Sequence, residues 1–215
     1  MRVAHFRHSC ILVELNGSKI LFDPGTFSHG FEGITDLDAI FITHQHPDHA
    51  DTARLPALID ANPNANLFAD PQTAEQLGDA WTTVRAGDVH QVGDAQITGD
   101  GGKHAVIHPD IPIVDNTVYL VGTADRPAQL MHPGDSLYVP DREIDILAVP
   151  AAAPWMKVSE TVDYLRAVKP RLAFPIHQEV AAPGARGIYY GRLDDMKPDG
   201  TEFRVLNEEE SFELQ

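Results

Sequence analysis

The chain has 215 residues, of which 16 are Lys or Arg and 32 are Asp or Glu, giving a formal net charge of −16. Its length suits one compact domain, and 43% hydrophobic with 22% charged residues argues against global disorder. The acidic balance disfavours a nucleic-acid partner or an anionic membrane surface, because both require clustered positive charge. One cysteine, Cys10, excludes an internal disulfide, and the chain shows neither a long apolar run nor a signal-peptide pattern. We therefore expect a cytoplasmic protein.

The first half of the chain begins with β-type alternation and continues with alternating strands and helices. Strands are expected at residues 2–6, 9–15, 19–22, 39–43 and 67–69. Asn16-Gly17 separates two of them and is a strong tight-turn dipeptide. Helices are expected at residues 51–61 and 71–80, the second with Pro71 in its first turn.

The second half shows the same succession of β-rich and helical segments. Short strands are expected within residues 82–99, a hairpin at 117–121 and 128–131, and buried strands at 144–149 and 172–176. Residues 158–168 predict a helix, because Val158, Val162 and Leu165 recur on one face. We predict one α/β domain over residues 1–215, made of two β-plus-α halves with the sheets inside and the helices outside.

The strongest local signal is the segment Thr43-His44-Gln45-His46-Pro47-Asp48-His49, between an expected buried strand and an expected helix. His44 and His46 are two residues apart on extended chain, so both rings project to the same side. Imidazole nitrogen and carboxylate oxygen are the donors that zinc and similar divalent ions take in proteins. A plain polar loop is the alternative, but four potential ligands in this context favour a metal site.

This HxHxDH pattern resembles the signature of the metallo-β-lactamase-fold hydrolases. The resemblance implies a four-layer αββα sandwich with a one- or two-metal site at the edge between the sheets. It also implies a third His, a bridging Asp and a last His, for which His104, Asp135 and His177 are candidates in the required order. The segments His8-Ser9-Cys10, Phe22-Asp23-Pro24, HPGDS and FPIH are similar to the L-ascorbate-6-phosphate lactonase-like branch, which contains many proteins without assigned substrates.

The resemblance also implies an allocation of the ligands between two divalent ions, most naturally Zn²⁺, with Mn²⁺ or Fe²⁺ as alternatives. The first ion takes His44, His46 and His104, the second takes Asp48, His49 and His177, and Asp135 bridges them. Two carboxylates contribute −2, and two ions with a bridging hydroxide contribute +3, so the loaded site carries +1. His108, four residues after His104, remains an alternative third ligand.

Further residues are expected around the metals. A metal-bridging hydroxide is the expected nucleophile, with Asp48 orienting it as well as binding metal. The proton donor for the leaving group is left open among metal-bound water, His108, His132 and His8. Asp23 is expected to brace the metal loop.

The segment 178–192 follows His177 and is rich in Gly, which is typical of a loop. We expect this loop to carry specificity, with Arg186 or Arg192 holding an anionic group and Tyr189 or Tyr190 walling the pocket. A solvent-exposed turn with paired arginines is the alternative.

The function predicted from these residues is metal-dependent hydrolysis of a small, anionic ester, lactone or phosphoester. The partner is expected to be a small-molecule substrate, with no nucleic acid and no membrane, and a homo-oligomer is left open. One alternative is a phosphodiesterase or nuclease of the same fold, which the net charge of −16 disfavours. Another alternative is a metal-binding protein without catalysis. The sequence decides neither the substrate nor the metal.

Overall fold

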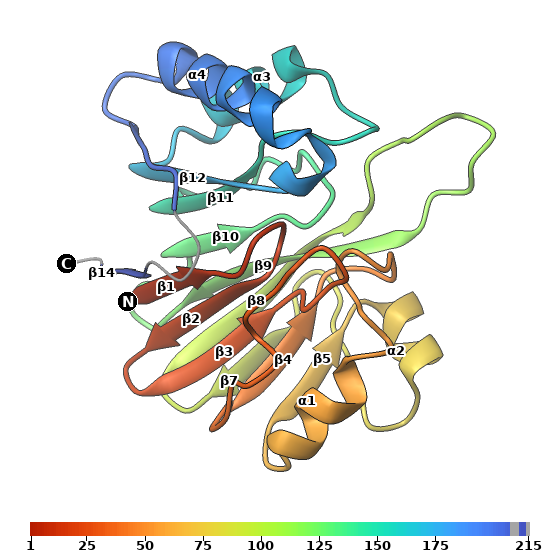
Figure 1. Ribbon diagram of the computed structural model, residues 1–215. Coiled ribbons are helices and arrows are strands. Elements are labelled where there is room, and N and C mark those ends of the chain that lie inside the picture. The colour runs from red at the N-terminus through yellow and green to blue at the C-terminus, as the bar shows by residue number, and fades with distance from the viewer. Residues whose placement is uncertain (207–210, 214–215) are drawn as a thin grey trace.

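Two β-sheets stacked face to face form the frame of the computed structural model (Figure 1), which describes residues 1–206 and 211–213. The first sheet contains β1 (Arg2–His5), β2 (Ile11–Leu15), β3 (Ser18–Phe22), β4 (Ala39–Ile42), β5 (Asn66–Ala69), β6 (Thr82–Thr83) and β14 (Ser211–Glu213). The second contains β7 (Val89–Val92), β8 (Ala95–Lys103), β9 (Asp115–Gly122), β10 (Leu130–His132), β11 (Ile146–Pro150), β12 (Leu172–Ile176) and β13 (Glu202–Phe203).

Each sheet combines an antiparallel part with a parallel part. In the first sheet the order is β14-β1-β2-β3-β4-β5-β6, and the strands from β3 to β6 are parallel. In the second sheet the order is β13-β12-β11-β10-β9-β8-β7, and the strands from β10 to β13 are parallel. Parallel strands end at a common edge, where the loops that follow them can meet.

Helices cover the outer face of each sheet (Figure 1). The first sheet carries α1 (Leu55–Ala61) and α2 (Pro71–Leu77), and the second carries α3 (Val158–Val168) and α4 (Arg186–Met196). Two short 3₁₀ helices, η1 (Gln178–Val180) and η2 (Pro183–Ala185), precede α4. The expected four-layer αββα sandwich is therefore confirmed. No helix in the described ranges is long and apolar enough to cross a membrane.

The core between the two sheets is aromatic at its centre. The Phe41 ring stacks on Phe22 and Phe68, with centroid distances of 5.4 and 4.5 Å, and Tyr119 from the second sheet meets its edge at 5.0 Å. The buried Tyr119 hydroxyl donates a hydrogen bond of 2.8 Å to the carbonyl of Ile42. The core thus fixes the end of β4, from which the His44–His49 segment departs.

The segment after His177 is where the expected secondary structure is wrong. Residues 178–192 were expected to form a loop, but they contain η1, η2 and most of α4. Gly lowers intrinsic helix propensity, yet Leu193 of α4 is fully buried and Tyr190 packs against the same apolar cluster. Tertiary packing therefore overrides the local composition. The first helix also begins later than expected, because the Asp51 carboxylate forms a turn with the N–H groups of residues 53 and 54.

The buried carboxylate of Asp70 generates a test of the fold. Its Oδ1 accepts hydrogen bonds from the N–H groups of Gln72 and Thr73 at the start of α2. Burial raises the pKa of this carboxyl from 3.8 to about 6, although the N–H groups oppose the shift. The folded state then holds more protons than the unfolded state between these pH values, so stability falls as pH rises through this window, by about 3 kcal/mol at most.

We expect Asp70→Asn to keep the cap, remove the buried charge and raise the melting temperature by a few degrees above pH 6, with little change below pH 4. Asp70→Ala is the comparison, because it removes the cap together with the charge. Thermal unfolding from pH 4 to 8 measures both variants. An Asn variant that is less stable than the parent at every pH would contradict this account.

Candidate metal centre

The candidate ligands gather at the sandwich edge where the parallel strands end. The segment after β4 supplies His44, His46, Asp48 and His49, and the ends of β8, β10 and β12 lead to His104, Asp135 and His177. Segments that are far apart in the chain therefore bring all seven residues of the expected ligand allocation to one place. Their atoms form two groups, each with ligand atoms within 4.8 Å of one another: His44, His46, His104 and Asp135, and His8, Asp48, His49 and His177.

Asp135 lies between the two groups with one carboxylate oxygen toward each. Its Oδ1 is 3.1 Å from the Nε2 atoms of both His49 and His177. Its Oδ2 is 3.3 Å from Nε2 of His104 and 4.0 Å from Nε2 of His44. The side chain is almost completely buried. A carboxylate in this position can coordinate two cations at once.

Three of the imidazoles are held by a hydrogen bond on the side away from the cluster. In each, Nδ1–H donates to an oxygen: from His49 to Asp23 Oδ2 at 2.7 Å, from His177 to the Ala152 carbonyl at 2.8 Å and from His104 to the Ala105 carbonyl at 2.6 Å. This bond selects the tautomer and leaves Nε2 directed at the cluster. Metal-ligating histidines are held in the same way.

Several buried atoms in the cluster have no partner in hydrogen-bonding geometry. Among the described residues they include His8 Nδ1, His104 Nε2, Asp135 Oδ1 and His177 Nε2. Buried polar atoms without a partner are costly and call for an explanation such as a bound ion. Imidazole nitrogens and a carboxylate oxygen are suitable donors for a divalent cation, so the residues present fit the metals that the fold implies.

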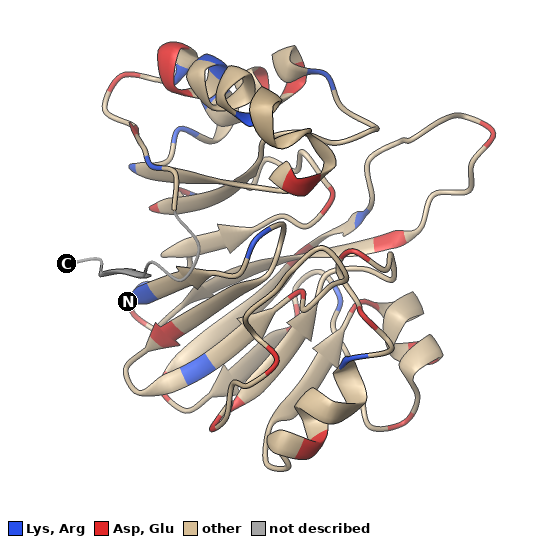
Figure 2. Cartoon of the chain, viewed as in Figure 1, with Lys and Arg blue, Asp and Glu red and all other residues tan. Residues whose placement is uncertain are grey.

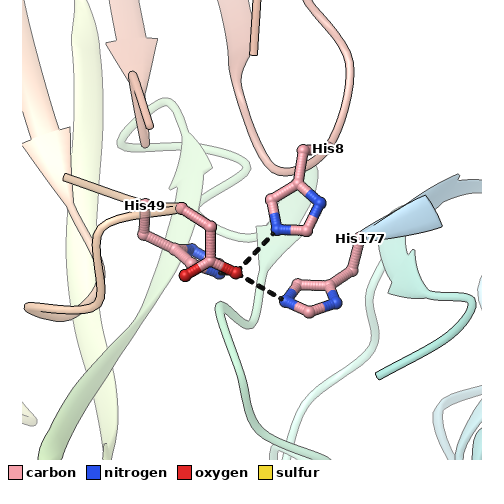
Figure 3. A group of neighbouring side chains, drawn as sticks. His8, His49 and His177 are labelled. Carbon is pink, nitrogen blue, oxygen red and sulfur yellow. Dashed lines mark hydrogen bonds and ion pairs between the residues drawn. The ribbon is translucent and has the colours of Figure 1, made fainter. Parts of the chain in front are cut away.

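His8 belongs to the second group, as Figure 3 shows by its position beside His177. It lies in the turn between β1 and β2, where its Nε2–H donates to Asp48 Oδ2 at 3.0 Å. The rings of His8 and His177 are 4.1 Å apart, and the His177 N–H donates to the His8 carbonyl. The His8-Ser9-Cys10 segment signalled a position near the site, and the structure places His8 in direct contact with Asp48.

The carboxylates of the cluster set the pKa values of the facing imidazoles. Burial lowers the pKa of His177, but Asp135 outweighs burial and raises this pKa to about 9. Burial acts likewise on His49, and Asp135 with Asp23 raises its pKa well above the usual value. Burial lowers the pKa of His8 to about 3. His49 and His177 therefore carry protons at neutral pH that a cation would displace on binding.

The imidazoles in turn hold the carboxylates in their charged form. Burial raises the pKa of Asp135, but the opposing charges of His177 and His49 bring it well below its usual range. Burial also opposes ionisation of Asp48, whose pKa is nevertheless lowered because the ring nitrogens of His177 and His8 face its carboxylate. Both carboxylates are thus anionic and able to coordinate a cation over the whole neutral pH range.

Asp23 braces the segment that follows β4, as the sequence predicted. Its Oδ1 accepts a hydrogen bond from the Thr43 N–H at 2.7 Å, and its Oδ2 accepts from the Thr43 hydroxyl at 2.8 Å and from His49. Asp23 itself is fully buried and has a positive φ of 47°. The buried carboxylate of a residue with a strained backbone therefore fixes the position at which the ligand segment starts.

His132 and His108, the two other histidines considered as proton donors, lie outside the ligand cluster. His132 is fully buried, its Nε2–H donates to the Ser9 carbonyl, and its Nδ1 accepts from the Gly134 N–H. With both nitrogens occupied, His132 holds two loops together, and the expected proton-donor role is not supported. His108 is exposed in the segment between β8 and β9, where it pairs with Asp110, and it belongs to neither ligand group. His104 is therefore the geometrically favoured ligand, and the exposed position of His108 does not support catalysis.

Two residues that hold Asp135 were not recognised in the sequence. Trp155 donates its indole Nε1–H to Asp135 Oδ2 at 2.8 Å, and its ring lies 5.8 Å from that of His104. Asn116 accepts the Asp135 N–H at 2.9 Å and donates to the Pro133 carbonyl. Neither residue lies in a ligand motif, so only the fold reveals these contacts.

A cavity of about 920 Å³ lies away from this cluster. It is bordered by the segments 126–129, 139–145, 167–171 and 199–201, near the starts of β11 and β12. Asp145 in its wall pairs with both Arg126 and Arg171. The cavity contains neither of the two ligand groups, so size alone does not identify the site of chemistry.

Comparison with known proteins agrees with this geometry. A family model described as the beta-lactamase superfamily domain matches residues 2–177. Protein Rv0786c of Mycobacterium tuberculosis is 60% identical over 209 residues, covering 97% of this chain and 98% of the relative. UPF0173 protein PF0020 of Pyrococcus furiosus is 30% identical, with 82% and 83% covered. The structure of a metallo hydrolase from Ignicoccus hospitalis superimposes with a TM-score of 0.73 at 18% identity, over 100% of this chain and 99% of that chain, which shows a shared fold.

Gly134 provides a test of how tightly the Asp135 loop is held. It has a positive φ of 57°, and a Cβ atom there would lie 2.3 Å from Asn116 Oδ1 and 2.7 Å from Thr43. Gly134→Ala should displace Asp135, weaken metal binding at least tenfold and lower the free energy of unfolding by about 1–3 kcal/mol. Gly33→Ala is the matched control, because a Cβ atom at Gly33 meets nothing within 4 Å. Isothermal titration with Zn²⁺ measures the metal affinity of each variant, and denaturant unfolding measures its free energy of unfolding. Equal values for the two variants would refute the account.

Proposed function

Because the chain belongs to the metallo-β-lactamase superfamily and, within it, to the UPF0173 metal-dependent hydrolases, we propose that it hydrolyses a small ester, lactone or phosphoester at a two-metal site. The observation that carries this proposal is the Asp135 carboxylate, which presents one oxygen to each group of imidazoles. Cations held by both groups would share Asp135 and lie close together, as two-metal hydrolysis requires.

In this proposal the ligands are divided as the sequence predicted. His44, His46 and His104 hold one ion, Asp48, His49 and His177 hold the other, and Asp135 is shared. The imidazole and carboxylate donors suit Zn²⁺, with Mn²⁺ or Fe²⁺ as alternatives. When bound, the two ions lower the pKa of a water molecule toward neutrality and polarise the substrate's carbonyl or phosphoryl oxygen.

The remaining residues position these groups. Asp48 keeps about a fifth of its side chain exposed, whereas Asp135 is almost fully buried, so Asp48 is the cluster carboxylate that can reach an attacking water. His8 holds Asp48 in place by donating Nε2–H to its Oδ2. Trp155 and Asn116 hold Asp135, and Asp23 holds His49. Asp48, Asp135 and His49 thus each have a partner behind them that fixes the direction of the side chain.

The charge distribution supports a small-molecule substrate over a nucleic acid. Figure 2 shows Lys and Arg scattered among Asp and Glu along the described chain. The net charge of −16 would repel a polyanion.

The test is removal and return of the metal. Exhaustive chelation should abolish hydrolysis of p-nitrophenyl esters and of bis(p-nitrophenyl) phosphate alike, and a divalent ion should restore whichever activity the protein has. His46→Ala should lose at least one ion per chain and lower kcat/KM at least 100-fold. His29→Ala, which removes an exposed imidazole outside the cluster, should retain both. Elemental analysis and steady-state kinetics provide the measurements. Activity that survives chelation, or full metal content in His46→Ala, would overturn the proposal.

A further inference from the structure

An apolar projection stands beside the candidate metal centre. Residues 105–114, the apolar arm, connect β8 to β9 and extend away from the sandwich (Figure 1). Val106, Ile107, Ile111 and Ile113 expose 55%, 39%, 46% and 48% of their surface there. In Figure 2 the arm is uncharged along both sides and acidic only near its tip. Clustered exposed aliphatic side chains indicate a binding surface, whereas isolated ones do not.

The arm is continuous with the ligand cluster. It begins directly after His104, whose N–H donates to the Val114 carbonyl and so closes its base. The Ala105 N–H donates at 2.8 Å to the carbonyl of Asp135. A small hollow at this base is bordered by His46, His104, Ile107, Ile111 and Ile113. An aliphatic group lying along the inner side of the arm would therefore end at two candidate ligands.

Three basic residues near the candidate ligands in the chain are already paired. Lys103 forms an ion pair with Asp115 at 2.6 Å, and Arg186 forms one with Glu179 at 2.5 Å. Arg54 pairs with Asp51 and Glu32. Arg186 therefore does not offer the unpaired charge that was expected to hold a substrate anion. Tyr190, the expected pocket wall, packs instead toward Phe203.

Another apolar side chain lies beside the second ligand group. Phe27 exposes 45% of its surface, and its ring meets the edge of the His8 ring at 5.2 Å. The arm adjoins the group with His46 and His104, whereas Phe27 adjoins the group with His8. Apolar surface is therefore available next to both groups.

We propose that the apolar arm binds the aliphatic part of an uncharged substrate. The protein would then hydrolyse carboxylic esters or lactones whose acyl chain is aliphatic and carries no charge. This inference rests on the hydrolase function proposed above and narrows its substrate class. The reaction consumes one water, breaks the acyl C–O bond and releases a carboxylic acid and an alcohol, or one hydroxy acid from a lactone. The alkyl chain gains binding energy by removing aliphatic surface of the arm from water.

Binding of alkyl hydroxamates to the metal-loaded protein tests this substrate class without requiring turnover. Acetohydroxamate and octanohydroxamate share a metal-chelating head and differ only in alkyl length. Isothermal titration should give a dissociation constant for octanohydroxamate that is at least tenfold lower than that for acetohydroxamate, a ratio of at least ten between the two compounds. Ile107→Asn and Ile111→Asn should each reduce this ratio to threefold or less. Val89→Asn, which changes an exposed aliphatic residue on the edge strand β7, should leave the ratio unchanged.

The same variants separate substrate binding from self-association. Sedimentation velocity shows whether the arm joins two copies of the chain. An arm substitution that dissociates a dimer while the hydroxamate ratio stays unchanged would overturn the inference in favour of an interface. Equal affinities for both hydroxamates would overturn the inference and leave the hydrolase proposal standing. If neither hydroxamate binds the metal-loaded protein, the proposed function fails, and the inference fails with it.

Discussion

The hydrogen bonds of the Asp23 carboxylate determine the geometry of the whole candidate centre. This one buried group accepts from the Thr43 N–H, the Thr43 hydroxyl and His49 Nδ1–H, and so fixes both the backbone that starts the ligand segment and one ligand's tautomer. Such an arrangement requires a rigid base, which the two sheets and the aromatic stack around Phe41 provide. The sandwich therefore acts as a support that holds ligands before a cation arrives.

The same edge combines strong electrostatics with apolar surroundings. Within the cluster, Asp135 and Asp48 stay anionic because imidazoles face them, and in the absence of metal His49 and His177 hold protons in place of cations. Outside it, Lys103 and Arg186 are paired and the arm beside His104 presents aliphatic side chains. A substrate would then be oriented by its apolar part, while its reactive group meets the charges.

The sequence predicted the layers, because strand and helix periodicities are local. It also named seven candidate ligands that the fold gathers at one edge, four from the fixed spacing of the HxHxDH motif and three, His104, Asp135 and His177, from the family resemblance. It could not predict the depth of His132 or the contact of Trp155 with Asp135, since both depend on segments that meet only in the folded chain. The helix α4 was missed because Gly187 and Gly191 suggest a loop, whereas the burial of Leu193 stabilises a helix. The pairing of Arg186 with Glu179 likewise needed the η1–η2 geometry.

The central claim is that Asp135 joins two metal sites. A crystal structure of the metal-loaded protein, with anomalous scattering recorded on both sides of the metal absorption edge, tests it most directly. The account predicts two ions, one among His44, His46 and His104 and one among Asp48, His49 and His177, each bonded to a different oxygen of Asp135. A single ion, or two ions of which only one contacts Asp135, would contradict it.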